Sequence, residues 1–437
     1  MNLDGFAPAF VRDLVDALHP SHSFAKAMQI DADALRVDGL TIPLRGIARA
    51  DVLGLGKASV PQVAAARAVL AKVLPLGPAL AITKAGQGDT ADGVHVFESS
   101  HPLCDARAVQ AAGLLRDAFA HAQADDLVVL CLSGGGSALA VEPRKPFTLD
   151  DKIAVNRELL RRGAPITDAN AIRQAMSCFK GGGLLSSLRA RTLLTLVTVD
   201  IPSGERALVA SGPTIPSPRA AHEVAPLLAR WLPEPLAAEI SAKLANAARL
   251  PAPPPNITTH VATVGDHAML VALAERIARD HGTRSIEVVH AALDTTLEQG
   301  LPSLLRAVDS LAQRSHPALL LSGGELTVDV RGQGRGGRNT EFVARAAEAL
   351  FLSRRTHLDD ATLDRALVFS LATDGSDGPT DAAGGYATRA MVDEDHTALR
   401  AALVDNDSLG WLERIGGVIT TGGTGTNLMD LRGILIA

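Results

Sequence analysis

Short apolar runs that end in glycine recur along the chain from Ala48, and each is followed by a longer stretch with helical periodicity. The clearest examples are ADVLGLGKAS before PQVAAARAVLAKVL, then DDLVVLCLSGGGSALA, and NITTHVATVGDHAMLVALAERIARDHG. Buried strands that alternate with amphipathic helices are typical of layered α/β folds. We therefore expect an α/β protein with mainly parallel or mixed sheets flanked by helices. Its ligands should gather at the carboxyl ends of the strands.

The chain is too long for one ordinary core, because 437 residues exceed the roughly 150 that a domain takes. The helical pattern PEPLAAEISAKLANAARL ends in the proline run 251–255, which can neither continue a helix nor join a central strand. We therefore predict two α/β domains, residues 1–250 and 251–437, with an active-site cleft between them that closes on its ligands. Within the second domain, LLLSGGELTVDV should form two strands bent at Gly323 and Gly324.

Charge and composition exclude several classes of partner. The net charge of −6 and the low aromatic content of 3% argue against nucleic acid, whose binding needs clustered Lys and Arg. The acidic start MNLDGFAPAFVRDLVDALHP is expected to form a helix and not a signal peptide, and no apolar run reaches the ~18 residues of a membrane span. Three scattered cysteines fit reduced thiols. We expect a soluble, cytoplasmic protein, and the prediction leaves room for a homodimer.

The first loop of chemical interest is GLGKAS, which contains Gly56 and Lys57. It is not a Walker A loop, because Asp51 stands at the first glycine position and Ala58 follows the lysine. Lys57 lies between a strand and a helix start, where an ammonium group could stabilise a phosphate or a transition state. The alternative is a solvated loop lysine.

The second loop, LSGGGSAL, follows the apolar run LVVLCL. Bare glycine amides in such a turn can surround phosphate oxygens without obstruction by side chains. The sequence thus predicts an anion cradle, and the alternative is a tight packing turn. The predicted cofactor-binding residues are Ser133, Gly134, Gly135, Gly136 and Ser137.

The third loop, SCFKGGGLL, places Lys180 before three glycines. We expect it to form a second turn that faces an anion, although a turn that ends a helix would explain the same residues.

The fourth loop, RGQGRGGRNTEF, carries the most charge. Gly332, Gly334 and Gly337 have the GxGxxG spacing of a dinucleotide site, but no ribose-binding acid stands at the expected distance. Arg335 and Arg338 favour phosphoryl transfer instead, because a planar guanidinium pairs with phosphate or carboxylate through two hydrogen bonds. We predict that Gly334 and Arg335 contact the cofactor. The alternative is a solvated hairpin tip.

The fifth loop, LATDGSDGPTDAAGG, brings several acids directly after the apolar run ALVFSLA. Mg²⁺ is usually bound by one or two carboxylates together with substrate phosphates, so Asp377 is a predicted metal ligand. Asp200, at the end of LLTLVTVD, is the second. Asp374 could accept the proton of an attacking hydroxyl. A purely structural DGSDG turn is the alternative.

Taken in order, the segments GKAS, LSGGGSAL, KGGGLL, VASGPT, SGGELTV, GGRNTE, ATDGSDGPTDAAG and TGGTGTN resemble the class II glycerate 2-kinases, whose C-terminal half is called the MOFRL domain. The resemblance covers nearly the whole chain. It implies phosphorylation of D-glycerate to 2-phosphoglycerate with ATP and Mg²⁺. It also implies that Lys57 and Arg338 form the catalytic pair.

The chain departs from the family pattern in two places. The acidic stretch that is typically DVPGDD is here DIPSGE, which leaves Glu205 as the close acid, and TGPTGTNVNDL is here TGGTGTNLMDL. The first change puts metal binding after Asp200 in question.

These observations combine into one hypothesis of direct in-line transfer. The SGGGS amides and Mg²⁺ hold ATP, Lys57 and Arg338 stabilise the moving phosphoryl group, and Asp374 assists the 2-hydroxyl. Glycerate's carboxylate would be bound by Arg335, Lys180 or the TGGTGTN loop. Similar sequences have also been named hydroxypyruvate reductases, so an NAD(P)H-dependent reductase that uses GQGRGG is the rival enzyme. A nucleotide-binding module without turnover is the third alternative.

Overall fold

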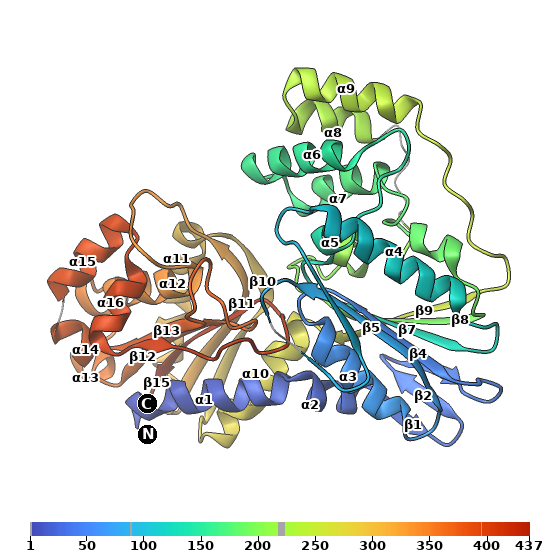
Figure 1. The fold of residues 1–437 in the computed structure, drawn as a ribbon. Coiled ribbons are helices and arrows are strands. Elements are labelled where there is room, and N and C mark those ends of the chain that lie inside the picture. Colours follow the sequence, from blue (N-terminus) through green and yellow to red (C-terminus); the bar gives the residue numbers. More distant parts are fainter. Residues whose placement is uncertain (1, 88–89, 217–222, 395) are drawn as a thin grey trace. The chain divides into compact units, whose positions relative to one another are not determined.

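The computed structural model describes residues 2–87, 90–216, 223–394 and 396–437 (Figure 1). Its contacts divide the chain into two compact units. We call Pro20–Val199 with Glu205–Val264 the parallel-sheet unit, and Met1–His19 with Asp200–Gly204 and Gly265–Ala437 the mixed-sheet unit. Each contains a six-stranded sheet with helices packed on it, as the α/β prediction required. Within the described residues, no helix has the length and apolar character that crossing a membrane requires.

The sheet of the parallel-sheet unit has the strand order β6-β5-β4-β7-β8-β9, and the pairings of β6 with β5, β5 with β4, β4 with β7 and β7 with β8 are parallel. All residues of the central strands β4 and β7 are buried, as expected of parallel strands covered on both faces. The carboxyl ends of these strands therefore meet at one edge. The strands are β4 (Ala50–Leu55), β5 (Leu76–Lys84), β6 (His95–Ser99), β7 (Leu127–Leu132), β8 (Thr192–Thr198) and β9 (Thr258–Gly265).

The helices of this unit pack in separate groups. One hydrophobic cluster joins α2 and α3 to the sheet and to a small antiparallel sheet, and another joins α6, α7, α8 and α9. The helices are α2 (Pro20–Ala27), α3 (Ser59–Leu70), α4 (Ala106–His121), α5 (Gly136–Leu139), α6 (Leu149–Arg161), α7 (Ile166–Ala175), α8 (Val224–Trp231) and α9 (Glu234–Ala245), with the 3₁₀ turns η1 (Gly183–Ser187) and η2 (Arg206–Ser211). The small sheet contains β1 (Gln29–Asp31), β2 (Ala34–Val37) and β3 (Leu40–Pro43).

The sheet of the mixed-sheet unit has the order β10-β11-β15-β12-β13-β14, with β10 parallel to β11 and the other pairs antiparallel. Because β15 runs against both neighbours, it begins where β11 and β12 end: Asp430 lies opposite Gly324 and Ala372. The strands are β10 (Ser285–Thr296), β11 (Ala318–Thr327), β12 (Ala366–Ala372), β13 (Gly384–Thr388), β14 (Val418–Ile419) and β15 (Asp430–Ile436). The segment LLLSGGELTVDV, predicted as two strands bent at Gly323 and Gly324, contains one continuous strand, β11, which runs through both glycines and ends at Thr327.

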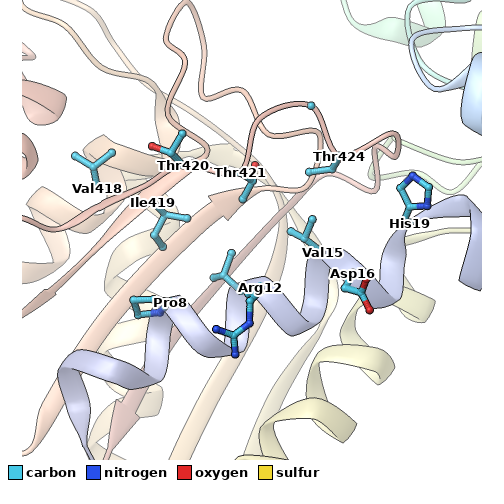
Figure 2. A pocket seen from close by; sticks show the side chains of 12 residues that line it. Pro8, Arg12, Val15, Asp16, His19, Val418, Ile419, Thr420, Thr421 and Thr424 are labelled. Carbon is cyan, nitrogen blue, oxygen red and sulfur yellow. The ribbon is translucent and has the colours of Figure 1, made fainter. Parts of the chain in front are cut away.

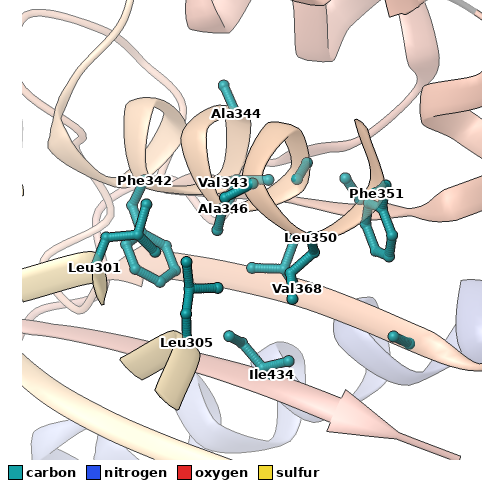
Figure 3. Close-up of a cluster of buried hydrophobic side chains, with 14 of the residues drawn as sticks. Leu301, Leu305, Phe342, Val343, Ala344, Ala346, Leu350, Phe351, Val368 and Ile434 are labelled. Carbon is teal, nitrogen blue, oxygen red and sulfur yellow. The ribbon is translucent and has the colours of Figure 1, made fainter. Parts of the chain in front are cut away.

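The two faces of this sheet are covered by different helices. Leu319 and Leu321 of β11 pack with α1 and α10, whereas the alternating residue Leu320 packs with α11 and α12 on the other face. Figure 3 shows part of this second cluster, with Leu305 and Phe342 beside Val368 of the sheet. The helices are α1 (Leu3–Leu18), α10 (His267–Asp280), α11 (Leu297–Leu311), α12 (Arg338–Ala347), α13 (Asp360–Leu363), α14 (Arg389–Glu394), α15 (His396–Asp405) and α16 (Ser408–Ile415), with a π-helical turn, η4 (Glu348–Leu352), after α12.

This division differs from the predicted domains 1–250 and 251–437 in three ways, of which the smallest is that the short segment Asp200–Gly204 belongs to the mixed-sheet unit. The N-terminal helix α1 packs on the C-terminal sheet, where Phe10 contacts Phe369 at 5.4 Å between ring centroids. The strand β9, which follows the proline run, completes the first sheet. The prolines end a helical segment, but a chain that has left a helix can still return to the same sheet. A local break in the sequence is therefore a poor marker of the domain boundary.

We predict that Leu350→Ala destabilises the mixed-sheet unit by about 2 to 5 kcal/mol, because Leu350 is fully buried in the cluster of Figure 3. Trp411 is buried in the same cluster and is one of only two tryptophans in the chain. A Trp231→Phe background therefore leaves Trp411 fluorescence as the reporter during urea unfolding. Val404→Ala, at a position 80% exposed, should change the unfolding free energy by less than about 0.5 kcal/mol. Equal effects of the two substitutions would contradict the assignment of this core.

Candidate active site

The carboxyl edge of the parallel sheet brings the first two predicted loops together. Lys57 follows β4 and Ser133 follows β7, and the Lys57 amide donates to the Gly134 carbonyl at 2.9 Å. The amide of Ala58 donates to Ser133 Oγ at 3.2 Å. Gly56 has φ +138°, and a Cβ there would come within 2.1 Å of Ser133 Oγ. A glycine is therefore required for the two loops to pack this closely.

The SGGGS turn is shaped as a cradle. Gly135 has φ +84° and lies under the Lys57 side chain, because a Cβ on Gly135 would be 3.1 Å from Lys57 Cγ. Within the described residues, the amides of Gly134 and Gly135 donate no hydrogen bond to the backbone. Just after them, Gly136 begins the short helix α5. These open amides next to a lysine fit the predicted anion site.

His101 lies beside the same glycine, a placement that the sequence gave no reason to expect. A Cβ on Gly135 would be 3.3 Å from His101 Cδ2. Burial lowers the pKa of His101 to about 4, and the charges of Lys57 and Lys84 add to the shift. The imidazole is therefore neutral at pH 7 and can accept a hydrogen bond.

The VASGPT segment forms the second wall of the cradle. The sequence singled it out only as part of the family resemblance and predicted no role for it. Ala210 and Ser211 both have positive φ, +52° and +60°, which is uncommon for residues other than glycine. Ser211 Oγ lies 2.5 Å from Ser137 Oγ and 2.8 Å from Asn170 Oδ1. Strained backbone of this kind concentrates at functional sites.

Lys180 lies in the interior of the parallel-sheet unit and not on the surface of the loop. Its side chain is buried, and Nζ donates to the carbonyl oxygens of Ser137 at 2.7 Å and Ala140 at 3.3 Å. Burial, with the charges of Lys152 and Arg173, lowers the pKa of Lys180 well below its usual value. The predicted direct contact with the cofactor is corrected: Lys180 supports the SGGGS turn from the interior.

In the mixed-sheet unit, Arg338 is the first residue of α12 and lies at the edge where β11, β15 and β12 meet. Its Nε contacts Asp430 Oδ2 at 2.6 Å, and Nη2 contacts Glu325 Oε1 at 2.7 Å. Asp430 is buried, whereas the Arg338 side chain keeps 34% of its surface exposed. Although burial opposes it, the two carboxylates raise the pKa of Arg338, so its charge is permanent. Nη1 has no hydrogen-bond partner among the described residues.

Asp377 is what fixes the start of α12. Its side chain is fully buried and accepts hydrogen bonds from the amides of Asn339 and Thr340, both at 2.8 Å, from Asn339 Nδ2 at 3.2 Å and from Thr340 Oγ1 at 2.9 Å. Four internal donors and the lack of exposed surface make this carboxylate poorly suited to Mg²⁺. The metal role of Asp377 stays a prediction, whereas its observed contacts fix the helix start that carries Arg338. No group of three or more His, Cys, Asp or Glu residues that could hold a metal ion occurs in the described ranges.

The GQGRGG loop does not present free amides to a ligand either. Its amides donate to the chain's own segment 405–407: Gln333 to Asp405 Oδ1 at 2.8 Å, Gly334 to the Asp405 carbonyl at 2.8 Å and Arg335 to Asp407 Oδ1 at 3.0 Å. The Arg335 guanidinium is exposed and paired with Glu413. These contacts do not favour the cofactor role of Gly334 and Arg335, which stays a prediction. A dinucleotide would find these amides already occupied.

The loop after β12 lies against the TGGTGTN segment. Thr373 Oγ1 donates to the Met429 carbonyl at 2.6 Å, and Thr424 Oγ1 donates to the Thr373 carbonyl at 2.5 Å. Asp374 is half-buried and accepts from the Ser376 amide at 3.1 Å. Asp200 Oδ2 accepts from Asn427 Nδ2 at 3.1 Å. Asp374 and Asp200 thus both follow strand ends and border the same segment.

A pocket of about 520 Å³ opens on the same segment. Figure 2 shows Val15 and Asp16 of helix α1 on one wall and side chains of residues 418–424 on the other. Val11 of the same helix also lines the pocket. The lining combines apolar side chains with polar ones, which are Arg12, Asp16, His19 and the threonines 420, 421 and 424.

Comparison with known proteins gives two family matches. Residues 6–245 match a family described as a domain of unknown function, DUF4147, and residues 318–430 match the MOFRL family. The chain is 34% identical to a putative hydroxypyruvate reductase of Agrobacterium vitis, over 90% of this chain and 89% of that protein. It is 30% identical to the glycerate kinase of Homo sapiens, over 95% and 90%.

Among solved structures, the crystal structure of glycerate kinase from Thermotoga maritima is similar, with a TM-score of 0.79 and 26% sequence identity. The match covers 99% of this chain and 98% of that one.

We predict that Asp377→Asn lowers the free energy of unfolding of the mixed-sheet unit by on the order of 1 to 3 kcal/mol without any metal present, because an amide group cannot accept all four hydrogen bonds. Asp381→Asn, at an exposed position in the same loop, is the matched control and should have no measurable effect. Trp411 fluorescence during urea unfolding measures both. A metal ligand would behave differently: Asp377→Asn would then leave the metal-free stability unchanged and weaken Mg²⁺ binding.

Proposed function

Because this chain belongs to the family of MOFRL-domain glycerate kinases, we propose that it transfers the terminal phosphoryl group of ATP to the 2-hydroxyl of D-glycerate. The observation that carries the proposal is the fixed arginine at the start of α12. Arg338 is oriented by two carboxylates and still has Nη1 without a partner among the described residues. A guanidinium held in this way is suited to stabilising the negative charge that develops on the phosphoryl oxygens during transfer.

The SGGGS turn supports the binding of ATP phosphates. Gly134 and Gly135 offer open amides, and the Lys57 side chain lies over them. Since a Cβ on Gly135 would meet both Lys57 and His101, this turn has room for an anion only while glycine occupies it. We assign Ser133, Gly136 and Ser137 to the frame of the cradle.

ATP enters such reactions as its Mg²⁺ complex, and the metal would neutralise charge between the terminal phosphates. Mg²⁺ needs only one or two protein carboxylates, so the absence of a larger acidic group in the described residues is compatible with it. Asp200 is the residue that we propose for this contact, since Asp377 is committed to α12.

Transfer itself asks mainly for positioning and charge stabilisation. We propose that Lys57 and Arg338 both act on the oxygens of the moving group, and that Asp374 accepts the proton of the attacking hydroxyl. Asp374 suits this role because it is half-buried at the end of a strand, in a loop pinned by Thr373. His101, neutral beside Lys57, can orient the lysine or a substrate hydroxyl without adding charge.

The rival reading is the NAD(P)H-dependent reduction of hydroxypyruvate, the activity in the name of the Agrobacterium vitis relatives. It would need the GQGRGG loop for the dinucleotide. The amides of this loop are engaged by Asp405 and Asp407, which favours the kinase. The cytoplasmic location and a homodimer stay predictions from the sequence.

We expect the protein to release ADP when D-glycerate is added with MgATP, and to leave NADH unoxidised when hydroxypyruvate is added. The product should be dehydrated by enolase without added phosphoglycerate mutase, because phosphorylation at the 2-hydroxyl gives the enolase substrate directly. A requirement for the mutase would move the reaction to the 3-hydroxyl, and NADH oxidation would favour the reductase.

For Arg338→Ala we expect turnover to fall by on the order of a hundredfold or more, with much smaller changes in the Michaelis constants. Arg338→Lys should recover only part of the loss, because an ammonium group cannot pair with Asp430 and Glu325 and also contact a phosphoryl oxygen in the same plane.

The alanine variant also leaves buried Asp430 without its closest cation, so its urea unfolding must be compared with that of the parent protein. If the variant is folded, keeps its turnover and only binds glycerate more weakly, Arg338 binds the substrate and does not stabilise the transition state.

A further inference from the structure

Three cationic side chains, Lys152, Arg173 and Lys180, lie together in the interior of the parallel-sheet unit. Lys152 Nζ donates to the carbonyl oxygen of Arg173 at 3.0 Å, and both lysines are at most 2% exposed. Arg173 on α7 is partly buried, and its Nε donates to Asn156 Oδ1 at 2.9 Å. The charges of Lys152 and Arg173 act on Lys180, so the three groups form one electrostatic cluster.

All the hydrogen-bond acceptors of this cluster are neutral. Lys180 Nζ binds two carbonyl oxygens, and Arg173 binds the side-chain amides of Asn156 and Asn170. No Asp or Glu forms an ion pair with any of the three cations within the described ranges. Other interior charges of the same unit are paired: Asp51 and Asp126 share Arg49.

Charging a buried lysine or arginine without a counter-ion is costly, because desolvation is not offset by an opposite charge, and burial accordingly lowers the pKa of Lys152 and of Lys180. Three such groups at one place are explained if the missing negative charge arrives with a ligand. A bound anion would favour their charged forms and complete the site.

A continuous series of hydrogen bonds links this cluster to the cradle. Arg173 Nη1 donates to Asn170 Oδ1 at 3.3 Å, and the same oxygen accepts from Ser211 Oγ at 2.8 Å. Ser211 Oγ in turn lies 2.5 Å from Ser137 Oγ in the SGGGS turn. Arg173 keeps some exposed surface, and its Nη2 has no partner among the described residues. The guanidinium is therefore oriented by two asparagines and open on one edge.

We propose that Arg173, backed by Lys152 and Lys180, is the subsite that binds the carboxylate of the hydroxy-acid substrate. The proposal rests on the proposed function, and it names the group that recognises the acid. A planar carboxylate matches the open edge of a guanidinium, whereas the rounder phosphate is served by the glycine amides and Lys57. The earlier candidate Arg335 is exposed and paired with Glu413, so it is less suited to this task.

The subsite should take up protons when it is filled. Burial lowers the pKa of Lys152 to about 7 and that of Lys180 as well, and Arg173 strengthens both shifts. Cys104 faces all three cations, and Cys178 faces Lys152; burial raises the pKa of both thiols, so they are neutral at pH 7. A bound carboxylate favours the charged lysines. Its binding should therefore be tightest below about pH 7 and weaken as the pH rises through that value.

The test compares Arg173→Gln with Arg161→Gln, a matched control on the exposed side of α6 where the arginine pairs with Glu158. For Arg173→Gln we expect the Michaelis constant for D-glycerate to rise about tenfold to a hundredfold, the loss of one or two charged hydrogen bonds. The constant for ATP should change little, and Arg173→Lys should recover part of the loss. A rise in the constant for ATP instead, or no change in either, would overturn the carboxylate assignment while the kinase function stands.

Binding measurements with compounds that cannot be phosphorylated to phosphoglycerate test the subsite independently of the kinase reaction. D-lactate carries the carboxylate and the 2-hydroxyl, and propane-1,2-diol lacks the carboxylate. Titration calorimetry in two buffers of different ionisation enthalpy should show that D-lactate binds with proton uptake, that the diol does not bind, and that Arg173→Gln abolishes the difference. This result would support the subsite even if D-glycerate failed to release ADP, an outcome that would refute only the proposed function.

Equal binding of D-lactate and the diol, or binding of D-lactate without proton uptake, would overturn the subsite. Each variant is first checked by urea unfolding. If Arg173→Gln does not fold, Arg173→Lys keeps the charge and carries the same comparison, since a shorter reach should still weaken D-glycerate binding and spare ATP.

Discussion

The carboxylate of Asp377 is the constraint on which the mixed-sheet unit depends. The start of a helix leaves several amides without partners, and here a distant loop supplies one buried carboxylate to two of them and to two side chains. This fixes the direction in which α12 leaves the sheet and therefore where its first residue, Arg338, can point. Glu325 and Asp430, on adjacent strands, then set the guanidinium plane. Helix start, loop and sheet edge thus determine the position of one arginine together.

The two units handle buried charge in opposite ways. Around Arg338 the charges nearly cancel, because Glu325 and Asp430 face Arg338 and Arg432. Burial raises the pKa of Asp430 to about 6 even though both arginines oppose the shift, so this carboxylate is close to the limit of what its surroundings stabilise. In the parallel-sheet unit, by contrast, Lys152, Arg173 and Lys180 donate only to neutral acceptors among the described residues. A cluster whose charges cancel can hold a functional side chain such as Arg338 in a fixed position. A cluster with an excess of positive charge is suited to binding an anionic ligand.

The sequence located the loops but could not show which partner each would meet. Glycine-rich turns after apolar runs predicted that loops with possible ligand-binding groups lie at the ends of strands in both sheets. The GKAS and SGGGS loops do pack together at such an edge. GQGRGG looked the same by composition, yet its amides are taken by residues 405–407, more than seventy positions away. Asp377 likewise resembled a metal ligand because nothing local reveals a distant helix start. Asn170 and Arg173 lie in no motif, Ser211 was singled out only as part of VASGPT, and only the fold links the three to Ser137 through hydrogen bonds.

The strained segment at Ala210 and Ser211 explains a second role of the KGGG loop, which supports the backbone of that segment. Left-handed residues other than glycine cost roughly 1 to 2 kcal/mol each, so their surroundings must over-determine them. The Ser211 carbonyl accepts from the amide of Gly181 and from Gln174 Nε2, and the Gly212 carbonyl accepts from the amide of Gly182. Gly181 and Gly182 can supply these amides because they too have positive φ. The third glycine loop therefore keeps Ser211 against Ser137 and Asn170. It does so by donating its backbone amides to the backbone carbonyls of residues 211 and 212.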